Sequence, residues 1–365
     1  ILPILIDSHV HLCMSGRIDQ EFREKQLEAT YEELVPMIEE HLRHQFSHGV
    51  LAVRDGGDRS GCVLRYLEEQ HDPATLPVMV TSPGRAYHRR DRYGALIGVC
   101  PEDDESLLQA VLRLAQPTRL IKVVNSGLNS MTRFAQQTEP QFSRQQLGEL
   151  VSEAKRLGSK VMVHANGEDP VRTAIEAGCH SIEHGFFMGR QNLELMADKG
   201  VYWVPTIYTM KAYALNAEHY RTSIDVKVAE QNLAHQLEQV ALARELGVKV
   251  ALGTDSGSIG VLHGESLVEE MKLFMRAGFS LAETIGCATK QGAQLLGLTD
   301  LGTIEPGKPA NFLVARGTPS QLPRKLTYLE TIYLNGQPSQ AYRRDPDYTT
   351  LRKFEGVAFS GKVRY

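Results

Sequence analysis

The sequence predicts an α/β protein with a (β/α)8 barrel of the TIM type over residues 1–300 and a small β appendage over residues 301–365. Three observations lead to this prediction. Short apolar runs alternate eight times with segments of helical periodicity, as in a barrel of repeated strand–helix units. Most of these runs are continuously apolar, which indicates parallel strands covered on both faces. No Gly-rich dinucleotide fingerprint follows the first run, so an open doubly wound sheet is disfavoured.

The expected strands are spread over the first two thirds of the chain, whose 365 residues exceed the roughly 250 that a complete barrel needs. They are Ile4–Leu12, Gly49–Asp55, Pro77–Ser82, Leu120–Asn125, Lys160–Ala165, Ser181–Gly185, Val201–Ile207 and Lys249–Thr254.

Helix starts between these strands are marked by capping boxes, in which a Ser or Thr precedes a Glu or Gln by three residues. The pairs are Thr30 with Glu33, Ser143 with Gln146 and Ser280 with Glu283. Pro36 interrupts the first of these helical patterns, because proline lacks the N–H that the helix needs. A longer amphipathic pattern over Asp225–Leu246 ends at Gly247, which is typical of a helix C-terminus.

The chain changes character after about Leu298. Gly and Pro residues punctuate Leu301–Lys308, and the short apolar runs Ala310–Ala315 and Thr331–Leu334 follow. Asn335-Gly336 is a strong hairpin signal, because both residues tolerate a positive φ. These features predict the small β appendage rather than a ninth barrel unit.

Composition excludes several classes of function. The formal net charge of −4 gives no reason to expect nucleic acid or an anionic membrane as a partner. No apolar run is long enough to span a bilayer, and the opening apolar run is too short for a secretory signal. Five scattered cysteines without a CxxC pair indicate reduced thiols, and hence a cytoplasmic protein.

Potential metal ligands lie where the strands are expected to end, which is where barrel enzymes carry their catalytic groups. In His9-Val10-His11 the alternation of a strand points both imidazoles the same way. The other candidates are Lys122, His164, His184 and Asp255. Each alone has an ordinary structural interpretation, such as a buried histidine or a helix-capping aspartate. Together, on four or five different strands, they predict a metal site.

These residues lie in motifs that resemble the amidohydrolase superfamily in order and spacing. The motifs are Leu-Ile-Asp-Ser-His-Val-His, Val-His-Ala-Asn-Gly, Ser-Ile-Glu-His-Gly and Leu-Gly-Thr-Asp-Ser-Gly. The strongest resemblance is to the imidazolonepropionase-related, prolidase-like branch, which includes dipeptidases and carboxypeptidases. Gly49–Gly57 and Leu301–Pro309 resemble that branch too, so the similarity covers nearly the whole chain.

The resemblance implies a two-metal site. His9 and His11 would hold the more buried ion, and His164 and His184 the more exposed one. Lys122, carboxylated by CO2, would bridge the two, and Asp255 would bind the first. Burial lowers a lysine pKa and frees the amine to form such a carbamate. Imidazole and carboxylate ligands suit zinc best, with manganese, cobalt and iron as alternatives.

The resemblance also implies hydrolysis of an amide (C–N) bond in a small molecule, an N-acyl amino acid or dipeptide. A hydroxide between the metals would attack the carbonyl, and Asp255 would carry its proton to the leaving nitrogen. Opening of a cyclic amide or lactone is the second enzymatic hypothesis. A mononuclear deaminase would leave Lys122 without a role, and a catalytically silent scaffold would not need intact ligands. Homo-oligomerisation is left open.

Substrate contacts are predicted at Tyr208, Arg85, Asn125, Asn166 and His263. Tyr208 follows the seventh strand, where it either contacts the substrate oxyanion or is a packed wall aromatic. Arg85 begins a basic run that either recognises a carboxylate or forms a solvated surface. Asn166 stands where many relatives have a second histidine, and Asn125-Ser-Gly replaces a more usual Ala-Ser-Gly-Gly.

Overall fold

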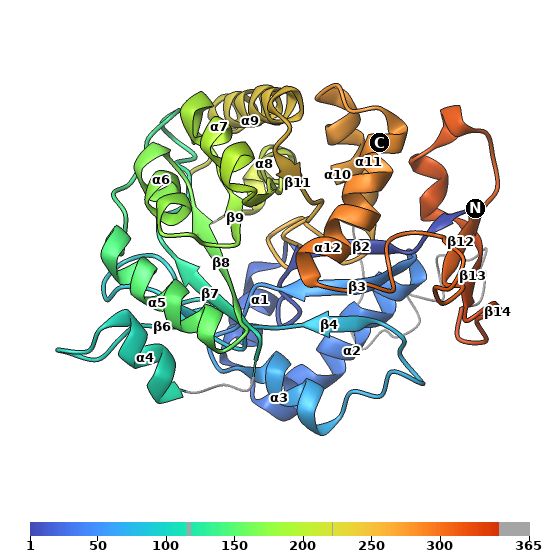
Figure 1. The fold of residues 1–365 in the computed structure, drawn as a ribbon, viewed down its shortest axis with the longest axis horizontal. Coiled ribbons are helices and arrows are strands. Elements are labelled where there is room, and N and C mark those ends of the chain that lie inside the picture. Colours follow the sequence, from blue (N-terminus) through green and yellow to red (C-terminus); the bar gives the residue numbers. More distant parts are fainter. Residues whose placement is uncertain (115–117, 221, 343–365) are drawn as a thin grey trace.

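A computed structural model describes residues 1–114, 118–220 and 222–342 of the chain (Figure 1). Residues 343–365 of the predicted appendage lie outside the described part. Parallel strands form the interior of the molecule, and helices surround them. The mixed α/β class with a parallel sheet is therefore confirmed.

The parallel strands belong to two sheets. One contains, in spatial order, β11 (Lys249–Val250), β10 (Tyr202–Val204), β9 (Ser181–His184), β8 (Lys160–Ala165), β7 (Leu120–Val124), β5 (Ala86–Tyr87) and β6 (Gly98–Val99). The other contains β2 (Leu5–Val10), β3 (Val50–Asp55) and β4 (Met79–Thr81). Each of the eight expected strands is present, several of them shorter than predicted, whereas the two-residue strands β5 and β6 were not predicted.

Backbone hydrogen bonds join the two sheets on one side. The Ser8 N–H donates to Leu252 O (2.9 Å), and the Asp255 N–H donates to His9 O (2.7 Å), so the chain after β11 runs beside β2. On the other side, no strand pairing joins β4 to β5 or β7 within the described residues. A closed barrel is therefore not shown, and closure stays a prediction.

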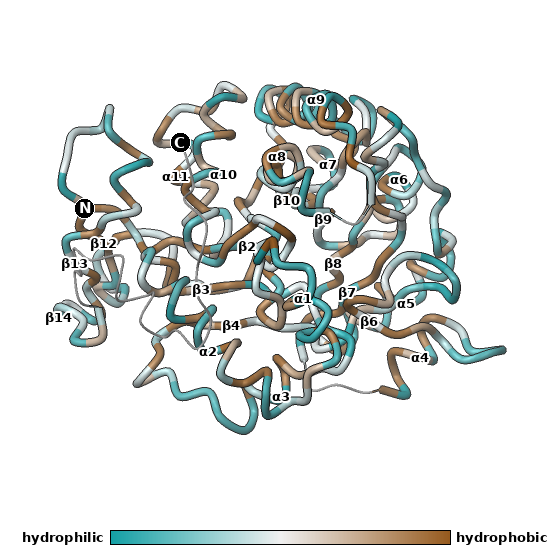
Figure 2. Tube along the Cα trace, turned by 180° about the vertical axis from the view of Figure 1, so that it is seen from behind, coloured by the Kyte–Doolittle hydropathy of each residue, from teal (hydrophilic) through white to brown (hydrophobic). Residues whose placement is uncertain are grey.

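Burial explains why the strands read as continuous apolar runs. All residues of β2, β3 and β7 are buried, as expected for strands covered on both faces. Figure 2 shows the same distribution, with brown, apolar segments along the strands and teal segments on outer loops. Trp203 on β10 is fully buried in this core.

The helices follow the strands around the outside. Their bounds are α1 Gln20–Glu28, α2 Tyr31–Ser47, α3 Cys62–Glu69, α4 Leu107–Leu114, α5 Arg144–Arg156, α6 Glu168–Glu176, α7 Gly189–Lys199, α8 Tyr208–Leu215, α9 Val226–Leu246, α10 Glu265–Arg276, α11 Leu281–Gly286 and α12 Gly292–Leu296. The three predicted capping boxes, at the starts of α2, α5 and α11, are confirmed. Helix α2 continues past Pro36, because Ile38, Leu42 and Phe46 on its inner face are buried in the core. Gly247 ends α9 with a φ of 73°.

The appendage is a four-stranded antiparallel sheet that includes the beginning of the chain. β1 (Leu2–Pro3) pairs with β12 (Phe312–Ala315), which pairs with β13 (Leu329–Leu334) and then β14 (Gln337–Pro338). The φ values of Asn335 (49°) and Gly336 (78°) confirm the predicted hairpin turn. The domain limits 1–300 and 301–365 stay a prediction.

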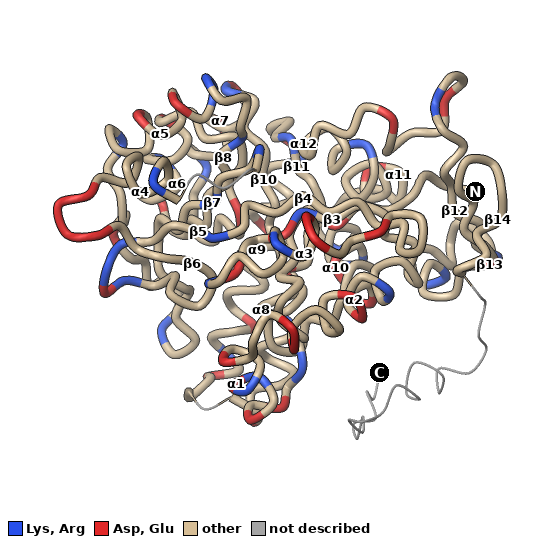
Figure 3. The backbone as a smooth tube through the Cα atoms, turned by 90° about the horizontal axis from the view of Figure 1, so that it is seen from below, with Lys and Arg blue, Asp and Glu red and all other residues tan. Residues whose placement is uncertain are grey.

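The surface carries both signs of charge. Figure 3 shows Lys and Arg interspersed with Asp and Glu over the helices and loops. Among the helices of the described residues, none combines the length and apolar character that crossing a bilayer requires.

Candidate active site

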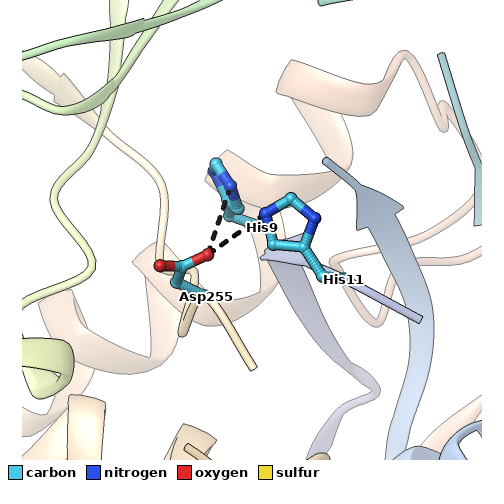
Figure 4. Close-up of side chains that lie close together, drawn as sticks. All are labelled: His9, His11 and Asp255. Atoms are coloured by element: carbon cyan, nitrogen blue, oxygen red, sulfur yellow. Dashed lines mark ion pairs between the residues drawn. The ribbon is translucent and has the colours of Figure 1, made fainter. Parts of the chain in front are cut away.

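Three of the predicted ligands meet at the carboxyl ends of β2 and β11 (Figure 4). Asp255 Oδ1 lies 3.6 Å from His9 Nε2 and 3.4 Å from His11 Nε2. His9 and His11 point to the same side because they are two residues apart in extended backbone. A Cβ on Gly253 would lie 2.8 Å from His9 N, so only glycine lets the two chain segments approach this closely.

The remaining histidines continue this group across the sheet. The ring centroid of His184, at the end of β9, lies 4.9 Å from that of His9 and 4.6 Å from that of His164 on β8. Three residues of this region adopt the left-handed backbone region: His184 (φ 66°), Thr206 (φ 44°) and Asp255 (φ 61°). Such strained residues concentrate at functional sites, because the surrounding structure must hold them in place.

Each of the four imidazoles has one ring nitrogen bonded to the protein. The partners are Glu183 Oε2 for His9 (2.7 Å), Gly57 O for His11 (3.0 Å), Thr206 Oγ1 for His184 (2.7 Å) and Gly127 O for His164 (3.2 Å). This leaves the second nitrogen of each ring for another partner, and His9 Nε2 is a buried atom without a hydrogen bond. Histidines that bind metals are anchored in this way, because the second hydrogen bond fixes the tautomer and the ring orientation.

Lys122 is the remaining predicted ligand, and it is fully buried on β7. Its Nζ has no hydrogen-bond partner among the described residues. Burial lowers the pKa of the Lys122 amine to about 8, although the charge of Glu183 acts in the opposite direction. A buried, unpartnered amine with a lowered pKa has the reactivity that carbamate formation needs.

Electrostatics in the site favour an ionised Asp255 and neutral imidazoles at His9, His164 and His184, whereas at His11 burial is outweighed by Asp255, which raises the pKa. Burial lowers the pKa of His9 to about 4 and that of His164 to about 3. Burial would raise the pKa of Asp255, but the neighbouring imidazoles of His11, His184 and His9 hold it well below its usual range. Neutral imidazole and ionised carboxylate are the forms that bind metal ions.

The spacing of these donors also fits a divalent cation. Two ligands of a tetrahedral zinc ion, each about 2.0–2.1 Å from the metal, are roughly 3.4 Å apart. The separations of 3.4 and 3.6 Å between Asp255 and the two imidazoles are close to that value, and both exceed an ordinary N–H···O hydrogen bond. His9, His11 and Asp255 therefore suit a metal ion.

A buried ion pair supports His9 from behind. Glu183 receives the His9 ring N–H, and both of its carboxylate oxygens lie 2.8 Å from Arg54 Nη2. The charge of Arg54 and the bond to His9 hold the pKa of Glu183 below its usual range against the effect of burial. This role of Glu183 was not predicted from the sequence. The available signal was an acidic residue in an otherwise buried strand, next to His184.

Two predicted substrate contacts, Asn125 and Asn166, connect loops in the structure. The Asn125 side chain donates to Pro170 O and accepts from the Phe142 N–H. The Asn166 side chain accepts from the Phe186 N–H (3.0 Å). Both amides thus position the loops beside His164, and their contact with substrate stays a prediction.

The other three predicted contacts, His263, Arg85 and Tyr208, form hydrogen bonds with groups other than the four site histidines. His263 is buried, with Nε2 2.8 Å from Met14 O and Nδ1 3.1 Å from Ser256 Oγ. Arg85 donates to the carbonyl oxygens of residues 59 and 60. Tyr208 begins α8, where Glu270 receives its N–H (2.6 Å). Their roles in substrate binding also stay predictions.

Three residues that the sequence analysis did not select lie around Asp255 and His164. The Tyr93 ring centroid is 5.2 Å from that of His164, and Tyr93 and Tyr213 are both close enough to Asp255 for electrostatic interaction. Arg23, on α1, also interacts electrostatically with Asp255. All three come from loops or helices, which carry no regular pattern that would place them near the strand ends.

Known proteins resemble the chain over most of its length. An uncharacterized protein of Mycobacterium tuberculosis is 28% identical over 92% of this chain and 84% of its own length. Ochratoxinase of Aspergillus niger is 31% identical over 63% of this chain and 48% of its own length. Imidazolonepropionase of Christiangramia forsetii is 24% identical over 92% of this chain and 83% of its own length.

A solved structure and a sequence family point to the same group of enzymes as these relatives. The crystal structure of a Xaa-Pro dipeptidase with bound methionine superimposes with a TM-score of 0.75 and 25% identity, covering 92% of this chain and 86% of that one. The sequence matches the Amidohydrolase family over residues 1–365. The resemblance to imidazolonepropionase-related and prolidase-like enzymes is thereby confirmed, and the chain belongs to the Amidohydrolase family.

Proposed function

We propose that this amidohydrolase is a two-metal enzyme that cleaves the amide (C–N) bond of a small molecule, an N-acyl amino acid or a dipeptide. His9, His11 and Asp255 would hold one divalent ion and His164 and His184 the other, with Lys122, as a carbamate, between them. Zinc is the expected metal. The expected compartment is the cytoplasm, and homo-oligomerisation stays open.

One observation carries this proposal. Four imidazoles lie side by side, each anchored through one ring nitrogen, next to a buried Lys122 amine that has no hydrogen-bond partner among the described residues. A core built for stability alone would satisfy these polar groups, because an unpartnered buried polar atom costs about 1–3 kcal/mol. A carboxylated Lys122 would replace the costly ammonium by two anionic oxygens.

The side chains of the site have different proposed roles in the reaction. A divalent metal pair, when bound, lowers the pKa of water and polarises a carbonyl group. Asp255 presents Oδ1 to the two imidazoles of β2, while Ser258 Oγ donates to its Oδ2 (2.9 Å) and fixes the carboxylate. Held in this orientation, Asp255 would take the proton of the attacking water and pass it to the leaving nitrogen. Glu183 keeps the His9 ring oriented throughout.

The relatives support the substrate class. The structurally similar Xaa-Pro dipeptidase acts, by its name, on dipeptides, and dipeptides contain the amide bond and the free carboxylate of the proposed substrates. The same residues would also serve ring opening of a cyclic amide or lactone, so that class belongs in any screen.

The test is to purify the chain, count its metal ions by elemental analysis, and screen dipeptides, N-acyl amino acids, cyclic amides and lactones. We expect about two metal ions per chain and cleavage of an acyclic amide. Asp255→Asn should keep much of the metal while kcat falls by on the order of 10²-fold or more. His219→Asn, which changes an exposed histidine, is the control and should alter neither quantity. One ion per chain, or turnover of lactones alone, would contradict the proposal.

A further inference from the structure

Helix α1 is an extra helix between β2 and α2, and it lies against the loops of the candidate site. Gln20 Nε2 donates to the backbone of η1 (Ala217–His219) at His219 O (2.9 Å). Arg23 Nη1 donates to Gly257 O (2.9 Å), two residues after Asp255. The short helix η1 follows α8 in the chain. The helix therefore covers one side of the strand ends that carry the predicted ligands.

The arginine on this helix has an unusual environment. Its side chain is partly buried, and no Asp or Glu of the described residues forms an ion pair with it. The groups that interact electrostatically with Arg23 are Tyr220, Tyr213 and Asp255. The ring centroids of Tyr213 and Tyr220 lie 5.0 Å apart, so two of the groups that interact electrostatically with Arg23 form an aromatic pair.

Other arginines of the protein show what a structural role looks like. Arg54 is fully buried and bonds Glu183 with Nη2, while its other nitrogens donate to Ser8 and Ser181. Arg65 and Arg113, on the surface, each bond a glutamate. A guanidinium has five N–H donors, and the bond to Gly257 O occupies one of those of Arg23. Arg23 thus carries a partly desolvated positive charge that interacts electrostatically with Asp255, and the remaining N–H groups of its guanidinium are available to a ligand.

From this arrangement we infer that Arg23 binds the free carboxylate of the substrate, so that the enzyme selects amides whose amine half is an amino acid. The planar guanidinium matches a carboxylate in two parallel hydrogen bonds, and partial burial strengthens that pairing. Arg23 would be a specificity-determining residue rather than one that takes part in bond cleavage. The inference rests on the proposed amide hydrolysis only for the identity of the substrate, because binding of a carboxylate can be measured without turnover.

A matched pair of small molecules tests this inference by calorimetry on the metal-loaded protein. The probes are 3-phenylpropanoate and 3-phenylpropanamide, which differ only in the carboxylate. Arg23→Gln should weaken binding of the acid by on the order of 10-fold or more and leave binding of the amide unchanged. Arg23→Lys, which restores the charge without the fork of donors, should recover part of the loss. Lys25→Gln removes an exposed charge from the same helix and is the control.

Kinetics supply the second measurement. With N-acetyl-L-phenylalanine, Arg23→Gln should raise KM by roughly 10- to 100-fold with kcat nearly unchanged, because the carboxylate contact exists in both ground and transition states. The metal content should not change. Equal losses for the acid and the amide, an unaltered affinity for the acid, or no binding of the acid by the unmodified protein would overturn the inference. If no amide is hydrolysed but Arg23→Gln still weakens binding of the acid and not of the amide, the proposed function is wrong and the inference about Arg23 stands.

Discussion

The two sides of the candidate site are held in different ways. His9, Lys122, His164 and His184 lie in or at the ends of parallel strands, and each is at least nine-tenths buried. Opposite them, α1 carries Arg23 on a helix in which Gln26 is the single buried residue. Its bonds to the rest of the molecule run through side chains such as Gln20 and Arg23 to backbone oxygens.

This difference separates the expected chemistry from the expected specificity. A side chain fixed by a packed strand cannot change place without disturbing the core, since interiors are close-packed. A polar helix held by a few hydrogen bonds can be altered at little cost to the fold. We therefore expect substitutions among the strand residues to affect metal and turnover together, and substitutions on α1 to affect substrate affinity alone.

The largest effect is expected at Lys122. Lys122→Ala should lose at least one metal ion, and kcat/KM should fall by on the order of 10³-fold or more, because the bridging oxygens disappear. A short carboxylic acid added to the variant should restore part of the activity. Elemental analysis and turnover measure both quantities, with Lys249→Ala, an exposed lysine on β11, as the control. A Lys122→Ala protein with full metal content and activity would contradict the bridging role of Lys122.

A smaller effect on metal binding is expected at Glu183, which bonds the predicted ligand His9. Glu183→Gln leaves the Arg54 charge without its partner and weakens the anchor of His9, so metal affinity should fall by about 10- to 100-fold. Competition with a chelator measures this change. Glu269→Gln removes a partly exposed glutamate that pairs with Lys211 and Lys272, and it should leave the affinity unaltered. If both variants bind metal like the unmodified protein, the supporting role of Glu183 is wrong.

The contrast between the two sides also explains what the sequence could predict. Strands leave a pattern that can be recognised in the sequence, since the extended backbone of β2 places His9 and His11 on one side by simple alternation, and His164 is the penultimate residue of β8. Helix α1 has no apolar stripe to signal its presence, and its Arg23 meets Gly257 only through the tertiary fold. Strands β5 and β6 have two residues each, too few to show alternation. The pairing of β1 with β12 joins segments about 310 residues apart in the sequence, which no local signal reveals.

A third test concerns pH and leaves the ligands untouched. Glu270 is buried, and burial raises its pKa to about 8, although it receives the Ile207 and Tyr208 N–H groups. The folded state then binds a proton that the unfolded state has lost above about pH 4.3. The Glu270 contribution to stability is therefore full at low pH and is lost as the pH rises toward 8. In Glu270→Gln, the free energy of unfolding should fall less between pH 5 and pH 8. Urea titrations at both values measure this, and parallel pH profiles would show that Glu270 does not titrate in this way.

The smallest effect is expected at the start of α1, where it bears most directly on the difference between the two sides. Asp19 Oδ1 receives the Phe22 N–H (3.0 Å) and caps the helix that carries Arg23. Asp19→Ala should cost about 1 kcal/mol, the usual effect of losing an N-cap, and it should loosen the first turn. Faster amide hydrogen exchange in α1 and a KM raised several-fold for N-acetyl-L-phenylalanine should follow, with kcat and metal content unchanged.

The matched variant for that test is Ser143→Ala, which removes the corresponding cap from α5. Helix α5 buries Leu147, Leu150 and Ala154 in the core and contributes none of the predicted site residues. Loss of the cap should therefore lower the free energy of unfolding by a similar amount there but leave KM unaltered. If Asp19→Ala changes kcat or releases metal, or if Ser143→Ala raises KM as much, then α1 is not the separable, substrate-binding side of the site that its polar surface and sparse contacts indicate.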